Sequence, residues 1–216
     1  MAPDGRPPTN PGDGPPSGQE HGPSRRPQTR PAGVTAYQAG EIRIGHREAI
    51  ADIVRATGVF SVLEIAVALE LFDTTYGPPS GPADAAGEGS GYEFLGLFDT
   101  AGGLLGYACF GPTPGTDRGY DLYWIAIAPQ AQGAGAGSFL IGEVERRLRE
   151  RNARLVLAET SSRGTYEPTR AFYVARGYTE SARVRAFYGP EDDRVLFTKR
   201  LQPAPRVRGS RGGETR

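Results

Sequence analysis

Small residues that could hold an anion gather at 132–138, where the sequence reads Gln-Gly-Ala-Gly-Ala-Gly-Ser. Glycine and alanine let backbone N–H groups approach a ligand that larger side chains would exclude. The turn lies between a predicted strand, Tyr120 to Ala128, and a predicted helix, so its unpaired amides and the positive end of the helix dipole point the same way. A phosphate or pyrophosphate fits this arrangement, and a tightly packed turn without a ligand is the alternative.

Two other phosphate-binding folds use a similar glycine pattern, and both depart from this sequence. A dinucleotide-binding fold would use Gly133 and Gly135 at the helix start and Glu159 on the ribose, but its third glycine would fall at Ser138. Its strands would also be parallel, whereas those preceding the turn are predicted to be antiparallel. A Walker A loop needs a lysine after the glycines, and the only lysine is Lys199.

The elements that must position this turn follow from hydrophobic periodicity. Strands are predicted over 41–44, 92–98, 104–111, 120–128, 154–159, 182–187 and 194–199, and helices over 46–60, from Ser61 through Phe72, from Ser138 through Leu148, and from Pro168 to Gly177. Antiparallel strands come first, and one parallel crossover follows in the middle. This order predicts an α+β fold: a mixed, mostly antiparallel sheet flanked by helices, with a central β-α-β crossover.

Residues 34–201 are predicted to form one domain between two tails. The tails, 1–33 and the basic 202–216, are rich in Pro and Gly and poor in large apolar side chains, so we expect them to be disordered. Residues 77–91 have no aliphatic side chain larger than Ala and are predicted to form a long flexible loop that could act as a lid.

Charge and cysteine content exclude several classes of protein. The 25 basic and 25 acidic residues balance, and the 34–201 core carries a net charge of −4, which suits a cationic acceptor better than nucleic acid. Cys109 is the only cysteine, so an internal disulfide and a multi-cysteine metal site are excluded, and we expect no metal. With no signal sequence and no stretch of about 20 apolar residues, we expect a cytoplasmic protein without a membrane partner.

The glycine turn and a later helix together resemble a known family. Ile125-Ala-Ile-Ala-Pro-x-x-Gln-Gly-Ala-Gly-Ala-Gly-Ser resembles the signature of the GNAT acetyltransferases, and Ala171-Phe-Tyr-Val-Ala-Arg-Gly-Tyr resembles the end of a helix in the same family. The resemblance covers nearly all of 41–201. One departure is Tyr166, which stands where the family often has an asparagine that contacts CoA.

The resemblance implies acetyl-CoA as co-substrate and assigns residues to it. The backbone of the turn would bind the pyrophosphate, and the strand before it would pair with the pantetheine arm, whose two amides need partners once desolvated. The implied cofactor-binding residues are Ile125, Ala126, Ile127, Gln132, Gly133, Ala134, Gly135, Ala136, Gly137, Ser138 and Tyr173.

Acetyl transfer to an amine needs a base, a donor for the developing oxyanion and a proton for the departing thiolate. By resemblance, Tyr173 serves the CoA sulfur and the N–H of Ile127 serves the oxyanion. Two carboxylates are candidates for the base. Asp121 corresponds to a family glutamate that activates the amine, and Glu159 ends an otherwise apolar strand, where we expect it to be partly buried. A water molecule is the third alternative.

The sequence therefore predicts an N-acetyltransferase that acts on the primary amine of an unidentified acceptor, a small molecule in preference to a protein. The alternative is a non-catalytic acetyl-CoA-binding module of the same fold. The sequence is compatible with a homodimer but does not determine the oligomeric state.

Overall fold

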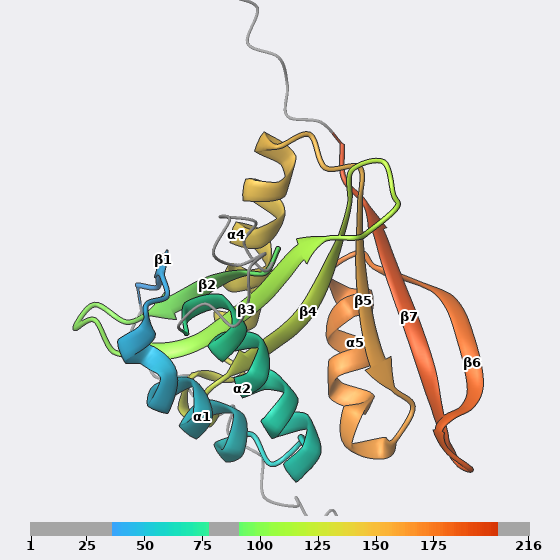
Figure 1. The fold of residues 1–216 in the computed structure, drawn as a ribbon, viewed down its shortest axis with the longest axis horizontal. Helices are drawn as coiled ribbons and strands as arrows, with labels where there is room; N and C mark the ends of the chain where they lie inside the picture. Colours follow the sequence, from blue (N-terminus) through green and yellow to red (C-terminus); the bar gives the residue numbers. More distant parts are fainter. Residues whose placement is uncertain (1–35, 78–90, 203–216) are drawn as a thin grey trace, which may run out of the picture. The chain divides into compact units, whose positions relative to one another are not determined.

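The computed structural model describes residues 36–77 and 91–202 (Figure 1). The two tails predicted to be disordered and the predicted 77–91 lid lie outside these residues, apart from Gly77, Gly91 and Gln202. None of the described helices is long and apolar enough to cross a lipid bilayer.

The described strands form one mixed sheet in the order β1-β2-β3-β4-β5-β7-β6. They are β1 (Gln38–Glu41), β2 (Glu93–Phe98), β3 (Leu104–Pro112), β4 (Gly119–Ile127), β5 (Leu155–Ser161), β6 (Thr179–Gly189) and β7 (Asp192–Arg200). Only the β4–β5 pair is parallel, and every other pair is antiparallel. The predicted α+β fold with a central crossover is confirmed.

Four α-helices flank the described sheet: α1 (Arg47–Ala56), α2 (Val62–Tyr76), α4 (Ala136–Glu150) and α5 (Glu167–Ala175). The start of α2 follows from the sequence, because the Ser61 hydroxyl accepts a bond from the Glu64 N–H and the Glu64 carboxylate accepts one from the Ser61 N–H. Pro168 lies in the first turn of α5, where its missing N–H costs nothing. Short 3-10 turns at Ile44–His46, Pro129–Ala131 and Gly164–Tyr166 precede α1, α4 and α5.

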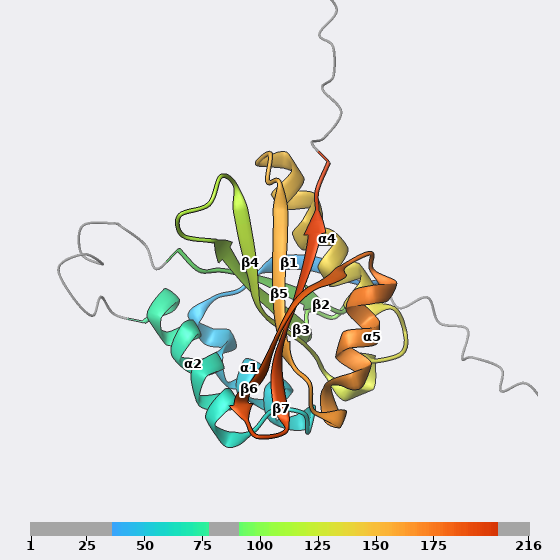
Figure 2. The ribbon, with the colours of Figure 1, turned by 90° about the vertical axis from the view of Figure 1, so that its right-hand side faces the viewer.

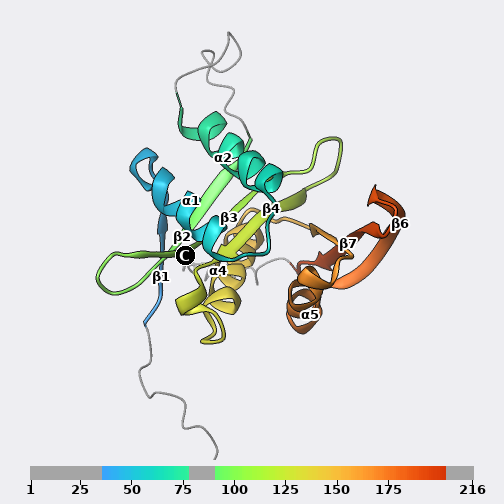
Figure 3. The same ribbon diagram turned by 90° about the horizontal axis from the view of Figure 1, so that it is seen from below.

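The helices cover opposite faces of the sheet, as Figures 2 and 3 show. Successive strand residues point to opposite faces, so Leu95 packs in the cluster under α4 and α5 while Phe94 packs in the cluster under α1 and α2. Ala108 and Tyr107 divide in the same way. Two hydrophobic cores thus hold β4 between them, and β4 carries the candidate site.

Two predicted boundaries were wrong. The first strand is Gln38–Glu41 instead of 41–44, because Ile42 is buried beneath α1 and α2 and Ile44 begins the turn into α1. Helix α1 ends at Ala56 instead of continuing to 60, and Gly58 follows with a φ of +65°.

Candidate functional site

Strands β4 and β5 separate partway along their length. They pair from Gly119 opposite Leu155 to Leu122 opposite Ala158, and no pairing between them continues beyond. At the same point the β3 register skips Tyr123, since Cys109 faces Trp124 and Phe110 faces Leu122. This β-bulge bends β4 and increases its twist, which explains why the two strands diverge there.

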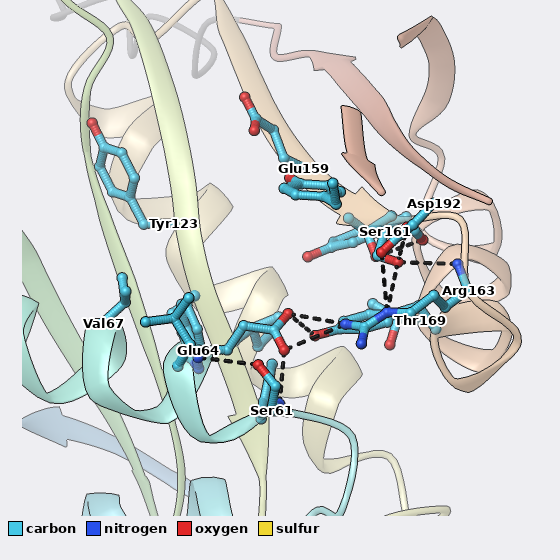
Figure 4. A pocket seen from close by; sticks show the side chains of 17 residues that line it. Ser61, Glu64, Val67, Tyr123, Glu159, Ser161, Arg163, Thr169 and Asp192 are labelled. Atoms are coloured by element: carbon cyan, nitrogen blue, oxygen red, sulfur yellow. Dashed lines mark hydrogen bonds and ion pairs between the residues drawn. The ribbon is translucent and has the colours of Figure 1, made fainter. Parts of the chain in front are cut away.

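A cavity of about 560 Å³ lies where the strands diverge (Figure 4). Its walls come from the start of α2, the middle of β4, the end of β5, the start of α5 and the β6–β7 turn. The lining residues are Phe60, Ser61, Leu63, Glu64, Val67, Tyr123, Trp124, Ile125, Glu159, Thr160, Ser161, Arg163, Tyr166, Thr169, Tyr173, Tyr188 and Asp192.

The glycine turn lies at the other end of the diverging part of β4. Gly133 and Gly135 have φ values of +72° and +90°, which L side chains rarely adopt, and a Cβ at either would meet no atom within 4 Å. Gly135 is the N-cap of α4, and no side chain caps the helix. The first-turn amides therefore have no intrahelical partner, and the turn residues 132–135 that lead into them are exposed.

The small side chains of the turn serve packing as well as access. Ala136 is buried in the core under α4, and a Cβ at Gly137 would lie 3.3 Å from the Phe172 ring and 3.7 Å from the Ile127 side chain. The Ala134 carbonyl accepts a bond from the Tyr37 hydroxyl at 3.3 Å. The contribution of these residues to a bound anion would therefore come from the backbone.

The backbone of β4 offers an open edge between the turn and the cavity. Ala128 donates to the Leu105 carbonyl on β3, so by alternation the N–H and C=O groups of Ile125 and Ile127 point away from β3, toward the side where β5 has diverged. The Gln132 side chain donates to the Ile127 carbonyl at 2.8 Å. Ala126, between them, is buried on the α1 and α2 face.

Tyr173 of α5 lies at the boundary of core and cavity. It is only 3% exposed, its ring contacts those of Phe172, Tyr178 and Phe197, and it lines the cavity. Burial raises the pKa of its phenol above the ordinary value, so the group stays protonated near neutral pH.

Asp121 lies on β4 just before the divergence, beside the cavity and outside its lining. Burial, followed by the negative charge of Glu159, raises the pKa of its carboxyl against the opposing effects of Thr113, Tyr123 and Arg194. The Tyr123 hydroxyl, which lines the cavity, lies 3.5 Å from Asp121 Oδ2. A carboxylate with a raised pKa is a better base at neutral pH than an ordinary one.

Glu159 lines the cavity, but its predicted partial burial was wrong. Its side chain is 38% exposed and forms an ion pair with Arg194 on the neighbouring strand β7. The reason is that β5 has already left β4 at this residue, so nothing covers the outer side of the carboxylate.

A polar network that sequence reasoning did not find joins three of the cavity walls. Arg163 lies between Glu64, at 3.3 Å from Oε1, and Asp192, at 3.2 Å from Oδ2. Asp192 also accepts bonds from the Ser161 hydroxyl and the Ser162 N–H. The capping pattern located Glu64 at a helix start, but no sequence signal places residues 64, 163 and 192 together.

Tyr166 has a structural partner in this network. It is buried, and its hydroxyl donates to Glu64 Oε1 at 2.6 Å while Arg163 lies over its ring. Partial burial alone would raise the pKa of Glu64, but bonds from Tyr166 and Ser61 and the charge of Arg163 outweigh it, so that pKa is lowered. Glu64 is therefore ionised and fully engaged.

Comparisons with known proteins agree with this geometry. Residues 65–178 match the model of the Acetyltransferase (GNAT) family. A solved structure from Desulfovibrio desulfuricans, assigned to the GNAT acetyltransferases, is 34% identical with a TM-score of 0.64, over 78% of this chain and 99% of that one. The chain has no match among curated protein sequences.

Two more distant structures share the fold. The ribosomal-protein-S18-alanine N-acetyltransferase from Escherichia coli is 17% identical with a TM-score of 0.57, over 80% of this chain and 98% of that one. An aminoglycoside 6'-N-acetyltransferase complexed with coenzyme A is 14% identical with a TM-score of 0.58, over 78% of this chain and 99% of that one. One of these enzymes is named for a protein acceptor and the other for a small molecule.

Proposed function

Since the chain belongs to the GNAT family of acetyltransferases, which use acetyl-CoA, we propose that it acetylates the primary amine of a small-molecule acceptor. The observation that carries this proposal is the divergence of β4 from β5. It leaves the glycine turn at one end of an open strand edge and an acidic cavity at the other.

The cofactor half of the proposal rests on backbone groups. The amides of 133–138 bind the pyrophosphate, because Gly133 and Gly135 have positive φ values and open space where a side chain would stand, so a phosphate can approach the backbone. Gln132 supports the turn through its bond to the Ile127 carbonyl. The Ile127 carbonyl already accepts that bond, so the open carbonyl of Ile125 and the open N–H of Ile127 bond the amides of the pantetheine arm as an added strand would.

Two groups of this chain act at the thioester. We assign the stabilisation of the developing negative charge on the carbonyl oxygen to the N–H of Ile125 instead of the predicted Ile127, because Ile125 lines the cavity together with Tyr173. Tyr173, kept protonated by its burial, gives its proton to the departing sulfur. A buried phenol can do so because the departing thiolate carries its charge in the same site, away from water. Protonation of the thiolate is therefore more favourable there than in water.

Of the two carboxylates, Asp121 is the proposed base and Glu159 the proposed anchor for the amine. Glu159 lines the cavity and can touch an ammonium group directly. Asp121 has the raised pKa that a base needs, and the Tyr123 hydroxyl or one water connects it to the cavity. Glu159 thus attracts the ammonium group of the acceptor, and Asp121 then removes one proton from it.

The size of the cavity supports a small acceptor. Its volume of about 560 Å³ lies within the range of about 300–1,000 Å³ typical of small-molecule sites, and five elements of the chain contribute to its walls.

A charge placed at the turn tests this proposal. Ser138 is the third residue of α4, so Ser138→Asp should stabilise the helix by about 0.3–1 kcal/mol through its dipole while repelling the pyrophosphate. We expect calorimetric affinity for acetyl-CoA to fall at least tenfold with no loss of Tm. The matched control is Thr100→Asp in the exposed β2–β3 turn, which should bind normally. Equal binding by both variants would refute the assignment of the turn.

A further inference from the structure

The cavity walls are dominated by apolar and aromatic side chains. The rings of Phe60 and Trp124 contact each other at a centroid distance of 4.9 Å with an interplanar angle of 32°, and Phe60 meets the Tyr166 ring edge-on at 6.3 Å. These three rings line one continuous side of the cavity. Such a surface favours an apolar body, because binding removes apolar surface of both partners from water.

The mouth of the cavity is apolar as well. Leu63, Val67 and Tyr188 line the cavity and yet are 74%, 41% and 52% exposed. Residues that both line a cavity and face solvent lie at its entrance. Exposed apolar side chains grouped around an opening mark a binding site more often than singly scattered ones do.

The charges of the cavity are unbalanced. Three lining residues are carboxylates, Glu64, Glu159 and Asp192, and Arg163 is the one lining cation among the described residues. Figure 4 shows Glu64, Arg163 and Asp192 gathered at one side, with Glu159 and Tyr123 apart from them. Because two carboxylates already engage Arg163, this guanidinium has little attraction left for an acceptor's carboxylate.

The remaining carboxylate, Glu159, lines the cavity and also forms an ion pair with Arg194. That cation lies outside the lining, and Asp121 flanks the same pair. Arg170 adds a third guanidinium group, which donates to the carbonyls of Ser161 and Arg163, so four carboxylates and three cations leave a surplus of one negative charge. The cavity should therefore attract an ammonium group and repel a carboxylate attached next to it.

We propose that the acceptor is an arylalkylamine or a similar amine with an apolar body and no carboxylate beside the amine. This inference rests on the proposed function. The ring or chain of the acceptor lies against Phe60 and Trp124, and its ammonium group meets Glu159 before losing its proton. Amino acids are disfavoured by charge, and polycations such as polyamines are disfavoured by the apolar walls.

Matched amines test this inference by thiol release from acetyl-CoA. The pairs are tyramine against tyrosine and phenethylamine against phenylalanine, with spermidine as a polar polycation. We expect kcat/KM to be at least tenfold higher for each amine than for its amino acid, and higher than for spermidine. An equal or greater rate with the amino acids or with spermidine would overturn the inference.

A variant that releases Arg163 sharpens the test. Asp192→Asn keeps the shape of the side chain and its bonds to Ser161 and Ser162 but removes one of the two charges that balance Arg163. The tyramine to tyrosine ratio should fall at least fivefold, mainly because KM for tyrosine decreases. Asp117→Asn, in the exposed loop before β4, is the matched control and should leave the ratio unchanged. A ratio that moves equally in both variants would contradict the role of Arg163.

The binding of acetyl-CoA separates this inference from the proposed function. If the wild-type protein binds no acetyl-CoA, the proposed function itself fails. If it binds acetyl-CoA but acetylates none of the aromatic amines, only the inferred acceptor class is wrong. Calorimetry with acetyl-CoA on the same preparation distinguishes the two results.

Discussion

The glycine turn and the acceptor cavity lie at opposite ends of the diverging part of β4, and they are built in different ways. The turn is contiguous in sequence, exposed, and offers backbone N–H groups shaped by two positive φ values. The cavity is lined by side chains from five elements that are up to 132 positions apart in sequence, from Phe60 to Asp192. A cofactor common to a family can be held by backbone geometry, whereas the acceptor must be chosen by side chains.

This difference predicts how each region responds to substitution. Changes in the cavity should alter chemistry or selectivity while leaving the affinity for acetyl-CoA intact. Substitutions in the turn should weaken acetyl-CoA binding only when they change the backbone conformation or add a charge there.

The largest effect is expected at Asp121. Asp121→Asn should lower kcat about a hundredfold by removing the base, and in the wild type kcat should fall in acid with a midpoint above the ordinary Asp pKa of about 3.9.

Because the folded-state pKa of Asp121 is raised, its ionisation costs stability as pH rises through that pKa. The variant should therefore have a higher Tm at pH 7, and the gain should vanish below both pKa values. A lower Tm at pH 7 would contradict the burial of the charge.

Tyr173 should give the next largest effect. Tyr173→Phe keeps the ring contacts and removes the proton donor, so kcat should fall about tenfold to a hundredfold with the KM for acetyl-CoA within twofold. Tyr178→Phe is the control, because its ring packs against that of Tyr173 but does not line the cavity. Equal losses of kcat in the two variants would assign both tyrosines to packing alone.

Two glycines of the same helix region test the backbone role of the turn. Gly135→Ala must hold a φ of +90°, at a cost of about 1–2 kcal/mol, and should weaken acetyl-CoA binding and lower Tm. Gly142→Ala, within α4 and with no atom within 4 Å of the added Cβ, should stabilise the protein by about 0.5–1 kcal/mol and leave binding unchanged. Unaltered acetyl-CoA affinity in Gly135→Ala would argue against the turn as the binding site.

The smallest effect is expected at Gln132. Gln132→Ala removes one hydrogen bond to the Ile127 carbonyl, worth about 1 kcal/mol, and should raise the KM for acetyl-CoA about fivefold. The kcat should change by less than twofold, since no reacting atom is touched. A kcat loss matching that of Tyr173→Phe would place Gln132 in the chemistry instead.

Much of the fold was predictable because its signals are local. The order of helices and strands, the capping box at Ser61 and the glycine turn before α4 each depend on residues a few positions apart. The boundaries of β1 and α1 were missed because burial of Ile42 and the turn at Gly58 outweigh periodicity there. The partial burial expected for Glu159 failed because it depends on the neighbour that β5 lacks at that point.

By itself, the sequence determined the family, the glycine turn and the candidate tyrosine and carboxylates, because each is encoded by residue type and short spacing. Only the tertiary structure decided where β4 leaves β5, since a one-residue bulge at Tyr123 depends on pairing with a separate strand. It alone joined Glu64, Arg163 and Asp192, whose contacts span about half of the chain. The charge of the acceptor cavity results from that assembly, because Coulomb energies depend on distance in space and not on distance along the chain.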